Sequence, residues 1–335
     1  MVLENKNRII ASGGGGFCNF ISNYFINKVD IEPYMIRFNG ASFFKYDFLM
    51  ALDERDYPKY LSYAYMCKLG RKLNLKFPKT INEKIQWLKL YDNIPLKSQL
   101  SDKVLVRDWV SDKIGANVLK PVLSVCNSFD EISFKLLPNS FVIKANHACS
   151  WNIFVKDKEN FVNNSKLMSM SEEMVDGWMS QCYFGWSDFE TQYRYIQPKI
   201  IVEELLKEYS GNSIIEFEIW VFNSKPLIFE QKYIDPISHK KMTSVFNVDY
   251  ENIDLKFIPD SVVNLSFKPH KLLKHAVEYS KVLGKDFKLV RIDWIVCRDK
   301  LYFNEMTFTP LSGYILFSKR YQDWYLKLGN MLKLK

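Results

Sequence analysis

Residues 289–310 constrain the fold more than any other part of this 335-residue chain. Two runs in which apolar and polar residues alternate flank Arg298-Asp299-Lys300, a pattern that predicts two antiparallel strands joined by a short loop. With those three residues as the loop, Asp293 lies opposite Glu305 and Arg291 lies opposite Thr307. Side chains alternate between the faces of a strand, so these four share one face. The other face is then expected to hold Ile292, Trp294, Val296, Tyr302 and Asn304.

Two carboxylates that face each other at about 5 Å repel, so a positive group should lie between them. A divalent ion fits best, because Mg²⁺ is usually held by one or two carboxylates together with substrate phosphates. We therefore expect Asp293 and Glu305 to bind magnesium. The alternative is a register that differs by one residue, which would leave both acids as solvated surface groups. Arg291 would equally be a surface charge in that case.

A second informative segment is the apolar run Phe141-Val142-Ile143-Lys144. A lysine within such a strand is costly unless its ammonium group reaches an anion, and a phosphate is a natural partner. The small polar residues that follow, 145–152, would then close over that phosphate with backbone donors. The alternative is that Lys144 extends along the strand end and places its charge in water.

Two residues of this loop have reactive side chains. His147 is a candidate base, although a single histidine is more often a hydrogen-bonded structural residue. Cys149 is the weaker candidate, because no second histidine in a suitable context accompanies it as a base.

Residues 199–206 form a third segment of interest, an apolar strand that ends in the acids Glu203 and Glu204. Such a strand can form a hinge between two lobes, where backbone groups and one carboxylate meet an adenine edge. The alternative is an ordinary strand end.

The remaining sequence predicts an α+β protein without internal repeats. Helical spacing runs through residues 56–92, in which Thr80-Ile81-Asn82-Glu83 is a capping box that starts a helix, and continues over 102–110. Further helices are expected at 165–184 and 269–283. Strands are expected at 140–145, 199–204, 214–222, 226–230, 288–297 and 301–309.

The first 50 residues differ from the rest of the chain. Ile9-Ile10 could form a short strand, and four glycines at 13–16 precede a helix-like segment. A strand, a glycine turn and a helix start can hold phosphate on backbone N–H groups. No further nucleotide-binding motif follows, so a flexible turn is the favoured interpretation.

Composition limits the partners and the location. The net charge of +8 would suit a polyanion, but the basic residues are scattered without any run of five, so we expect no nucleic-acid partner. The six cysteines form no CxxC pair, which favours reduced thiols and a cytoplasmic protein. No segment approaches the about 18 to 20 consecutive apolar residues of a membrane span.

Taken in order, these segments and several short motifs resemble the ATP-grasp superfamily, and within it the TupA-like branch associated with teichuronopeptide biosynthesis. The resemblance runs from about residue 56 to the end of the chain. It is carried by Phe77-Pro78-Lys79-Thr80, residues 82–92, Asp102-Lys103 with Arg107, residues 144–152, 155–158 and 201–204, Arg291-Ile292-Asp293, residues 304–310, and Ser312-Gly313.

The resemblance implies an ATP-grasp fold of the α+β class, in which two α+β lobes clasp ATP and follow a mainly helical N-terminal region. The implied division of the chain is 1–50 of unclear role, 51–118 helical, 119–203 the small lobe with the phosphate loop, and 204–335 the C-terminal lobe with the metal site.

The resemblance also implies roles for single residues. Lys103 and Lys144 would hold ATP phosphates, and Arg291 would neutralise the phosphoryl oxygens. Glu203 would bind the adenine amino group, and Glu216 would bind the ribose. The implied nucleotide contacts are Lys103, Lys144, Ser150, Glu203, Glu204, Leu206 and Glu216. The implied metal ligands are Asp293, Glu305 and Thr307, and the candidate catalytic residues are Arg291, Lys144 and His147.

Two departures from the family pattern bear on these roles. Thr307 stands where many members of the superfamily have asparagine, which weakens the expectation of a second magnesium ion. The phosphate loop of the family commonly reads Asn-His-Gly-Ser-Gly, whereas residues 146–150 read Asn-His-Ala-Cys-Ser.

We therefore expect an enzyme that forms a carbon–nitrogen bond with ATP and Mg²⁺. The resemblance implies that it amidates a uronic acid of a capsular or other surface polysaccharide, or its precursor, with an amino acid or amine. A place beside a membrane-bound assembly machinery is compatible with this expectation. The alternatives are a glycosyltransferase of polysaccharide synthesis, although the chain has no Asp-x-Asp element, and a non-catalytic scaffold that kept the fold.

Overall fold

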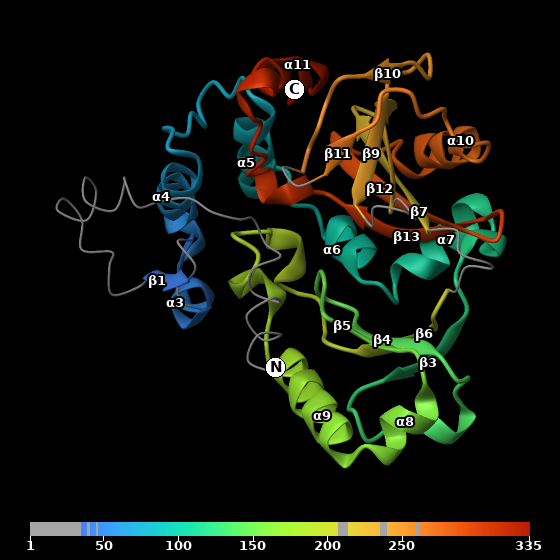
Figure 1. Cartoon of the computed structure of the whole chain (residues 1–335). Helices are drawn as coiled ribbons and strands as arrows, with labels where there is room; N and C mark the ends of the chain where they lie inside the picture. The colour runs from blue at the N-terminus through green and yellow to red at the C-terminus, as the bar shows by residue number, and fades with distance from the viewer. Residues whose placement is uncertain (1–34, 39–40, 45, 207–213, 235–239, 259–260) are drawn as a thin grey trace.

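The computed structural model of the chain describes residues 35–38, 41–44, 46–206, 214–234, 240–258 and 261–335. Its strands form a seven-stranded, a four-stranded and a two-stranded sheet. The seven-stranded sheet occupies the upper part of Figure 1 and the four-stranded sheet the lower part. Helices α6 (Pro95–Ser101) and α7 (Val106–Ile114) lie at the boundary between them, next to the last strand of the larger sheet.

The large sheet has the strand order β10-β9-β8-β7-β12-β13, and β11 joins it by pairing with β9. All of its pairs are antiparallel except the short pairing of β11 with β9. The strands are β7 (Ile215–Phe222), β8 (Lys225–Ile234), β9 (Lys241–Phe246), β10 (Asn252–Ile253), β11 (Val262–Val263), β12 (Leu289–Cys297) and β13 (Lys300–Thr307).

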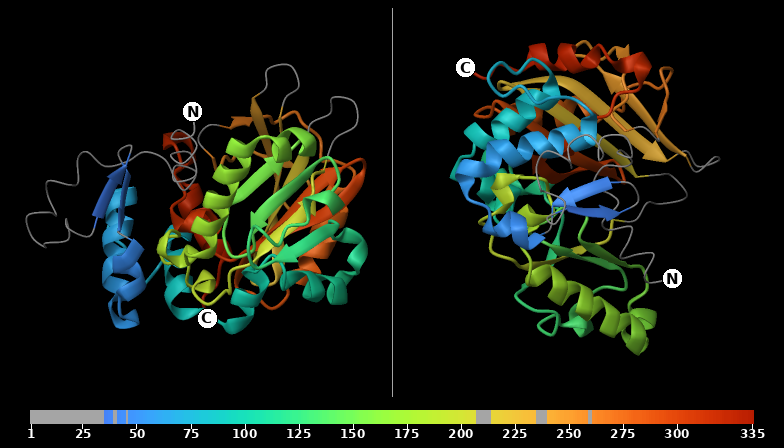
Figure 2. Two further views of the ribbon diagram at one scale, coloured as in Figure 1. Left: turned by 90° about the horizontal axis from the view of Figure 1, so that it is seen from below. Right: turned by 90° about the vertical axis from the view of Figure 1, so that its left-hand side faces the viewer.

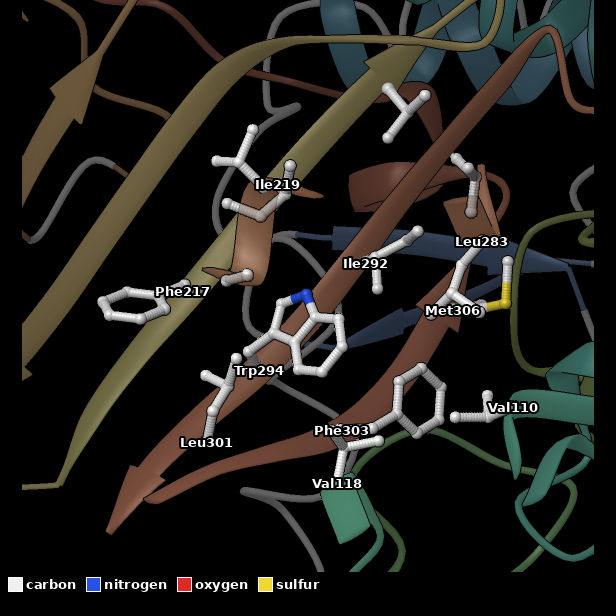
Figure 3. Close-up of a cluster of buried hydrophobic side chains, with 14 of the residues drawn as sticks. Val110, Val118, Phe217, Ile219, Leu283, Ile292, Trp294, Leu301, Phe303 and Met306 are labelled. Carbon is white, nitrogen blue, oxygen red and sulfur yellow. The ribbon is translucent and has the colours of Figure 1, made fainter. Parts of the chain in front are cut away.

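One face of this sheet is apolar and packs on helices α7 and α10 (Leu273–Leu283). Figure 3 shows the side chains that meet there, with Trp294 at the centre and Phe303 and Met306 beside it. Trp294 is fully buried, and its indole N–H donates to the Ser280 hydroxyl of α10 over 2.8 Å. This face therefore anchors the strands that carry the acids of the other face.

The other face is apolar only at one end, where it packs on α5 (Ile81–Tyr91) and α11 (Trp324–Met331). The predicted capping box of α5 is confirmed, because Thr80 and Glu83 satisfy each other's backbone N–H groups. Asn82 exchanges two hydrogen bonds with the Ile315 backbone, of 2.9 and 3.1 Å, and so ties α5 to the segment that follows β13.

The small sheet has the order β3-β6-β4-β5. Its strands are β3 (Val122–Cys126), β4 (Phe141–Ala145), β5 (Asn152–Val155) and β6 (Ile200–Glu204), and its helices are α8 (Lys158–Asn163) and α9 (Ser165–Met179). Ile143 and Val202 point into an apolar core with α9. Lys144 and Glu203 occupy alternate positions and therefore point to the opposite face. In Figure 1 the helices lie on the far side of this sheet from the large sheet.

A third group of elements precedes the sheets. It contains β1 (Met35–Phe38), β2 (Ala41–Phe44), α3 (Tyr46–Ala51) and α4 (Tyr57–Leu69). Tyr57 and Leu61 of α4 pack against Phe184 and Phe189 from the segment between α9 and β6. Figure 2 shows these elements as a separate layer beside the two sheets. Ile9-Ile10 and the glycines at 13–16 lie outside the described residues.

Short 3-10 turns connect several of these elements. They are Glu54–Asp56, Ala116–Val118, Phe134–Leu136, Tyr183–Gly185, Thr191–Tyr193, Pro310–Gly313 and Lys319–Tyr321.

The hairpin of β12 and β13 confirms the predicted pairs but corrects the predicted turn. The turn has two residues, Arg298 and Asp299, both with positive φ (52° and 57°), and Lys300 already pairs with Cys297. Two-residue hairpin turns favour positive φ at both turn residues, because that backbone matches the right-handed twist of the flanking strands. A bulge between Asp293 and Trp294 then leaves Asn304 as the extra residue, which restores the pairing of Asp293 with Glu305.

The bulge also corrects the predicted faces. Phe303, rather than Tyr302, lies opposite Trp294 and in the apolar core. Tyr302 pairs with Ile295 and shares the face of Asp293 and Glu305.

Helix boundaries differ from the expected ones at several places. The helical pattern over 56–92 contains two helices, α4 and α5, and residues 70–80 between them form no helix. The helix expected from 102 begins at Val106, because the Asp102 carboxylate accepts from the backbone N–H groups of Val104 and Leu105 and turns the chain. Helix α9 ends at Met179, and α10 begins at Leu273. No helix of the described residues is long and apolar enough to cross a membrane.

Candidate active site

Four carboxylates form one row across the large sheet. Asp293 of β12 pairs with Glu305 of β13 on one side and with Glu218 of β7 on the other, and Glu218 pairs with Glu230 of β8. Directly paired residues of antiparallel strands share a face. The four acids therefore lie side by side on one face, one on each of the adjacent strands β8, β7, β12 and β13. We call Glu230, Glu218, Asp293 and Glu305 the acid row. Like charges in such positions destabilise a sheet unless cations compensate.

Two cations compensate part of the acid row. Arg291 binds Asp293 through two hydrogen bonds of 2.8 and 2.6 Å, and one of its nitrogens lies 3.4 Å from Glu218. Lys232 of β8 donates to Glu218 and lies 3.6 Å from Glu230. Glu305 has no hydrogen bond or ion pair with any described residue. The end of the row at β13 therefore carries uncompensated negative charge.

Burial and neighbouring charges together decide the protonation of Glu218, Glu230 and Asp293. Burial favours the neutral form of Glu218, but Arg291 and Lys232 outweigh it and lower the pKa of Glu218 to about 2. Burial raises the pKa of Glu230 to about 7, and only Lys232 and the Thr243 hydroxyl oppose the shift strongly. Burial also raises the pKa of Asp293, with Glu218 and Glu305 adding to the effect and Arg291 opposing it. A further positive charge near Asp293 would stabilise its ionised form.

The donor set at Asp293 and Glu305 fits a hard divalent ion. Among the described residues, no group of three or more His, Cys, Asp or Glu side chains is arranged to hold a metal. Mg²⁺ does not need such a group, because it commonly takes one or two carboxylates and completes its shell with phosphate and water. Thr307 lies on the same face, opposite Arg291, and is half-buried. Its neutral hydroxyl is a weaker metal ligand than either carboxylate.

A second charged cluster lies on the small sheet. Lys144 of β4 donates to Glu203 of β6 over 2.6 Å, Lys120 lies 3.2 Å from the same oxygen, and Arg107 lies 3.6 Å from the other. Burial opposes ionisation of Glu203, but Lys120 and Lys144 outweigh it and lower its pKa to about 2. Lys144 is thus next to Glu203 and not next to the acid row. Lys120 and Arg107 are members of this cluster that the sequence analysis did not assign.

Lys120 also connects the two sheets. Its ammonium group is buried and donates to the Asn304 side chain over 2.9 Å, while the same group lies beside Glu203. Burial, with Lys144 adding to it, lowers the pKa of Lys120 to about 8. The bulged residue of β13 is therefore held by the cluster of the small sheet.

The loop after β4 is fixed by buried hydrogen bonds. Asn146 donates to Asp102 over 2.9 Å, and its oxygen accepts from the Lys199 backbone over 2.7 Å. The ammonium group of Lys103 donates to the Ala148 carbonyl, and its backbone N–H donates to the Asn146 carbonyl over 3.1 Å. Lys103 is therefore held against the loop expected to cover phosphate.

His147 lies inside this loop and is almost fully buried, with 1% exposed. Its Nε2 lies 3.2 and 3.1 Å from the carbonyls of Trp178 and Gln181, and its Nδ1 lies 3.1 Å from the side-chain oxygen of Asn146. Burial lowers its pKa. This placement favours a structural role for His147, the alternative to the predicted base.

Ser150 is exposed and has a positive φ of 62°. This is the second position at which the family commonly has glycine, and a serine there is strained. Cys149 is exposed as a residue, but protein atoms around its sulfur desolvate the thiol and, with Glu305 adding to the effect, raise its pKa to about 11. Cys149 therefore stays protonated and is unsuited to act as a nucleophile.

The remaining predicted contacts surround these clusters. Glu204 is exposed at the end of β6, and Leu206 is half-buried two residues later. Glu216 on β7 pairs with Lys232 and with Ile295, so it shares the face of the acid row. The structure thus groups Glu216 with Arg291, Asp293, Glu305 and Thr307, whereas Lys144, Glu203 and Glu204 belong to the small sheet.

Comparisons with known proteins agree with the family resemblance. The family model described as TupA-like ATPgrasp matches residues 83–333. No curated protein is significantly similar to the chain.

Solved structures with detectable similarity are distant. They include D-alanine–D-alanine ligase from Bacillus anthracis complexed with ATP, at 16% identity and a TM-score of 0.38, over 70% of this chain and 63% of that one. The D-alanine–D-alanine ligase from Helicobacter pylori has 15% identity and a TM-score of 0.42, over 75% and 69%. The ATP-grasp ligase PsnB complexed with a phosphomimetic variant of its minimal precursor, Mg and ADP has 11% identity and a TM-score of 0.38, over 74% of this chain and 64% of that one. The chain spans less than two thirds of the Bacillus anthracis and PsnB chains.

Proposed function

The chain belongs to the TupA-like ATP-grasp family and has the fold of that family, and from this premise we propose that it is an ATP- and Mg²⁺-dependent carboxylate–amine ligase. The observation that carries the proposal is the end of the acid row, where Asp293 and Glu305 face each other and Glu305 has no partner among the described residues. Phosphoryl transfer requires mainly positioning and charge neutralisation, which such a site can supply.

In this proposal, Asp293 and Glu305 hold magnesium, and the Thr307 hydroxyl is a third, weaker ligand. Bound Mg²⁺ supplies charge neutralisation for the phosphoryl oxygens. Arg291 lies beside Asp293 and stabilises the negative charge that the transferred phosphoryl group carries. Its ion pair with Asp293 keeps it oriented until the substrates arrive.

The nucleotide contacts follow from the small sheet and its loop. Glu203 accepts from the adenine amino group, since one of its oxygens has only the 3.6 Å contact with Arg107. Lys144, held 2.6 Å from Glu203, binds near the adenine end as well as toward the phosphates. The remaining contacts are Lys103 and Ser150 with the phosphates, the backbone of Glu204 to Leu206 with the adenine edge, and Glu216 with the ribose.

The proposed reaction has two steps. A carboxylate oxygen of the substrate attacks the γ-phosphorus of ATP, and ADP leaves, which gives an acyl-phosphate. The nitrogen of an amine then attacks the acyl carbon, phosphate leaves, and the nitrogen loses a proton to give an amide. No nucleophile of the protein is needed, in agreement with the protonated Cys149.

The proposed substrates are a uronic acid of a capsular or other surface polysaccharide, or of its precursor, and an amino acid or amine. The family resemblance supports this choice, and the high aromatic content suits sugar binding. The proposed location is the cytoplasm, beside a membrane assembly machinery. We propose the lobe division at 119–203 and 204–335 on the same grounds.

The test is ADP release from ATP with a panel of uronic acids against amino acids and amines. We expect release only with Mg²⁺ and a carboxylate present. Asp293→Asn should reduce it at least about 100-fold, whereas Glu172→Gln on the exposed surface of α9 should not change it. An Asp293→Asn enzyme with full Mg²⁺-dependent ADP release would contradict the metal assignment.

The same panel separates the alternatives. Turnover of a nucleotide sugar without ATP would indicate a glycosyltransferase. A rise in unfolding temperature with ATP and Mg²⁺ but no ADP release with any pair would indicate a scaffold that kept its nucleotide site.

A further inference from the structure

The segment between α9 and β6 carries a buried carboxylate that forms no ion pair with any described residue. Glu190 is 8% exposed, and no described Lys, Arg or His nitrogen lies within 4.0 Å of its oxygens. Its one hydrogen bond comes from the Thr309 hydroxyl to Oε1. An ionised carboxylate in such surroundings is costly unless a cation joins it. Glu190 is therefore a buried acid with one oxygen available.

The hydrogen bond to Oε1 has a fixed direction. Gln192 donates to the Thr309 oxygen over 2.8 Å, so the Thr309 hydrogen points to Glu190. The nearest buried cation, Lys89, uses its ammonium group elsewhere: it donates to the Asp188 carbonyl over 2.6 Å and to the Ser312 hydroxyl over 2.8 Å. Lys89 therefore acts on Glu190 without a direct ion pair: burial raises the pKa of Glu190 to about 7, and the charge of Lys89 is the largest effect that opposes this rise.

Two tyrosines belong to the same segment, and the backbone N–H of Tyr193 donates to the Glu190 backbone carbonyl over 3.1 Å. Tyr183 and Tyr193 pack edge to face with ring centroids 4.9 Å apart. Burial is the main cause that raises the pKa of both hydroxyls well above the ordinary value. Cys149, then Glu190 and Glu305, add to the shift of Tyr183, whereas Glu190 and then Glu305 add to that of Tyr193. The rings therefore lie within electrostatic reach of both carboxylates. A carboxylate beside aromatic rings is a combination that favours an organic cation.

Glu190, Tyr183 and Tyr193 lie within electrostatic reach of the acid row. Thr309 follows Thr307 by two residues on the chain that leaves β13, and Glu305 acts electrostatically on Glu190, Tyr183 and Tyr193. We propose that Glu190, Tyr183 and Tyr193 bind the ammonium group of a primary amine, the second substrate of the ligase. This inference rests on the proposed function, because it names where the amine would bind before it attacks.

The site can be tested without knowing the natural amine. Thermal unfolding at pH 8 is compared in methylammonium chloride, sodium chloride and potassium chloride at equal ionic strength. The proteins are wild type, Glu190→Gln, Tyr183→Leu and the matched surface control Glu172→Gln. We expect methylammonium to raise the unfolding temperature of wild type and of the control by about 1 to 3 °C over sodium. The shift should vanish in Glu190→Gln and in Tyr183→Leu.

A second readout separates a binding role from a structural one. In sodium chloride, Glu190→Gln should unfold at the same or a higher temperature than wild type, since it removes an unpaired buried charge. A lower temperature would mean that Glu190 stabilises the fold with Lys89. Equal methylammonium shifts in wild type and Glu190→Gln, or no shift in wild type, would overturn the site. Equal shifts with potassium would overturn its preference for amines.

Steady-state kinetics provide a third test of the site. With any pair that gives ADP release, Glu190→Gln should raise the KM for the amine at least tenfold and change the KM for ATP less than twofold. If no pair gives ADP release in wild type, the ligase proposal fails, whereas the methylammonium comparison still decides whether Glu190 binds a cation.

Discussion

Lys120 donates a hydrogen bond of 2.9 Å to Asn304, and with the same ammonium group it lies 3.2 Å from Glu203. One buried cation thus joins the charged cluster of the small sheet to the strand that carries Glu305. The two groups of residues that the proposed reaction needs lie on different sheets, one on β4 and β6 and the other on β12 and β13. Lys120 is a contact through which the position of one group can affect the other.

Lys120→Met should therefore affect both sheets. Methionine fills the space of the lysine stem but leaves Asn304 without its donor, so we expect a loss of about 1 to 3 kcal/mol in the free energy of unfolding. Chemical denaturation measures this, with Lys166→Met on the exposed surface of α9 as the control. The KM for ATP should also rise. An unchanged free energy of unfolding and an unchanged KM would contradict the connecting role.

Glu305→Gln should separate function from stability. Because Glu305 has no partner in the described residues and faces Asp293, its neutral analogue relieves repulsion. Without Mg²⁺ the free energy of unfolding should rise by up to about 1 kcal/mol. Added Mg²⁺ and ATP should stabilise wild type but not the variant. A clear loss of stability in Glu305→Gln without Mg²⁺ would show that Glu305 has a structural partner.

Glu203→Gln should remove a contribution to stability that depends on pH in a defined direction. The pKa of Glu203 is about 2 in the folded chain, against about 4.3 in an unfolded one. A lowered pKa stabilises the fold above the unfolded value, and this contribution is lost as the pH falls through the folded value. Wild type should exceed Glu203→Gln by about 3 kcal/mol at pH 7. The difference should shrink between about pH 5 and pH 2, as followed by urea unfolding.

The opposite dependence would contradict the ion-pair cluster around Glu203. A difference that grows as the pH falls would mean that Lys120 and Lys144 do not hold the ionised form. Glu172→Gln, an exposed acid of α9, should show no such pH dependence.

Gly329→Ala should be strongly destabilising, because a methyl group at this position in α11 would lie 2.1 Å from the Lys79 carbonyl. The backbone before α5 would have to move, and we expect a cost of about 2 to 4 kcal/mol. Gly177→Ala in α9 is the matched control, since nothing lies within 4 Å of its added methyl group. It should stabilise by about 0.5 to 1 kcal/mol. Equal thermal unfolding shifts in the two variants would contradict the close packing of α11 on α5.

The local sequence was sufficient to pair Asp293 with Glu305, but the route to that result was partly wrong. Alternation predicts the two strands and their facing acids. It does not reveal that the turn has two residues or that Asn304 bulges, because a three-residue loop and a two-residue turn with a bulge give the same pairing at the acids. Only the residues between the turn and the bulge, such as Tyr302, exchange faces.

The rest of the acid row could not be predicted from local pattern. Glu218, Glu230 and Lys232 do occupy alternate positions with other polar residues in β7 and β8, which is a signal for one polar face. The strand order β8-β7-β12-β13 decides that these faces coincide, and that order depends on packing between distant segments. Glu190 and Lys120 lie outside regular strands and helices, so no periodicity marks them.

The extra residue in β13 has an implication for variation in this part of the chain. Removing Asn304 would turn the hairpin into a regular one and would still leave Asp293 opposite Glu305, because every later residue moves up by one position. What disappears is the acceptor for Lys120. A homologue with a one-residue gap there should keep the facing acids that we propose as metal ligands, whereas its small sheet should be held less firmly to β13.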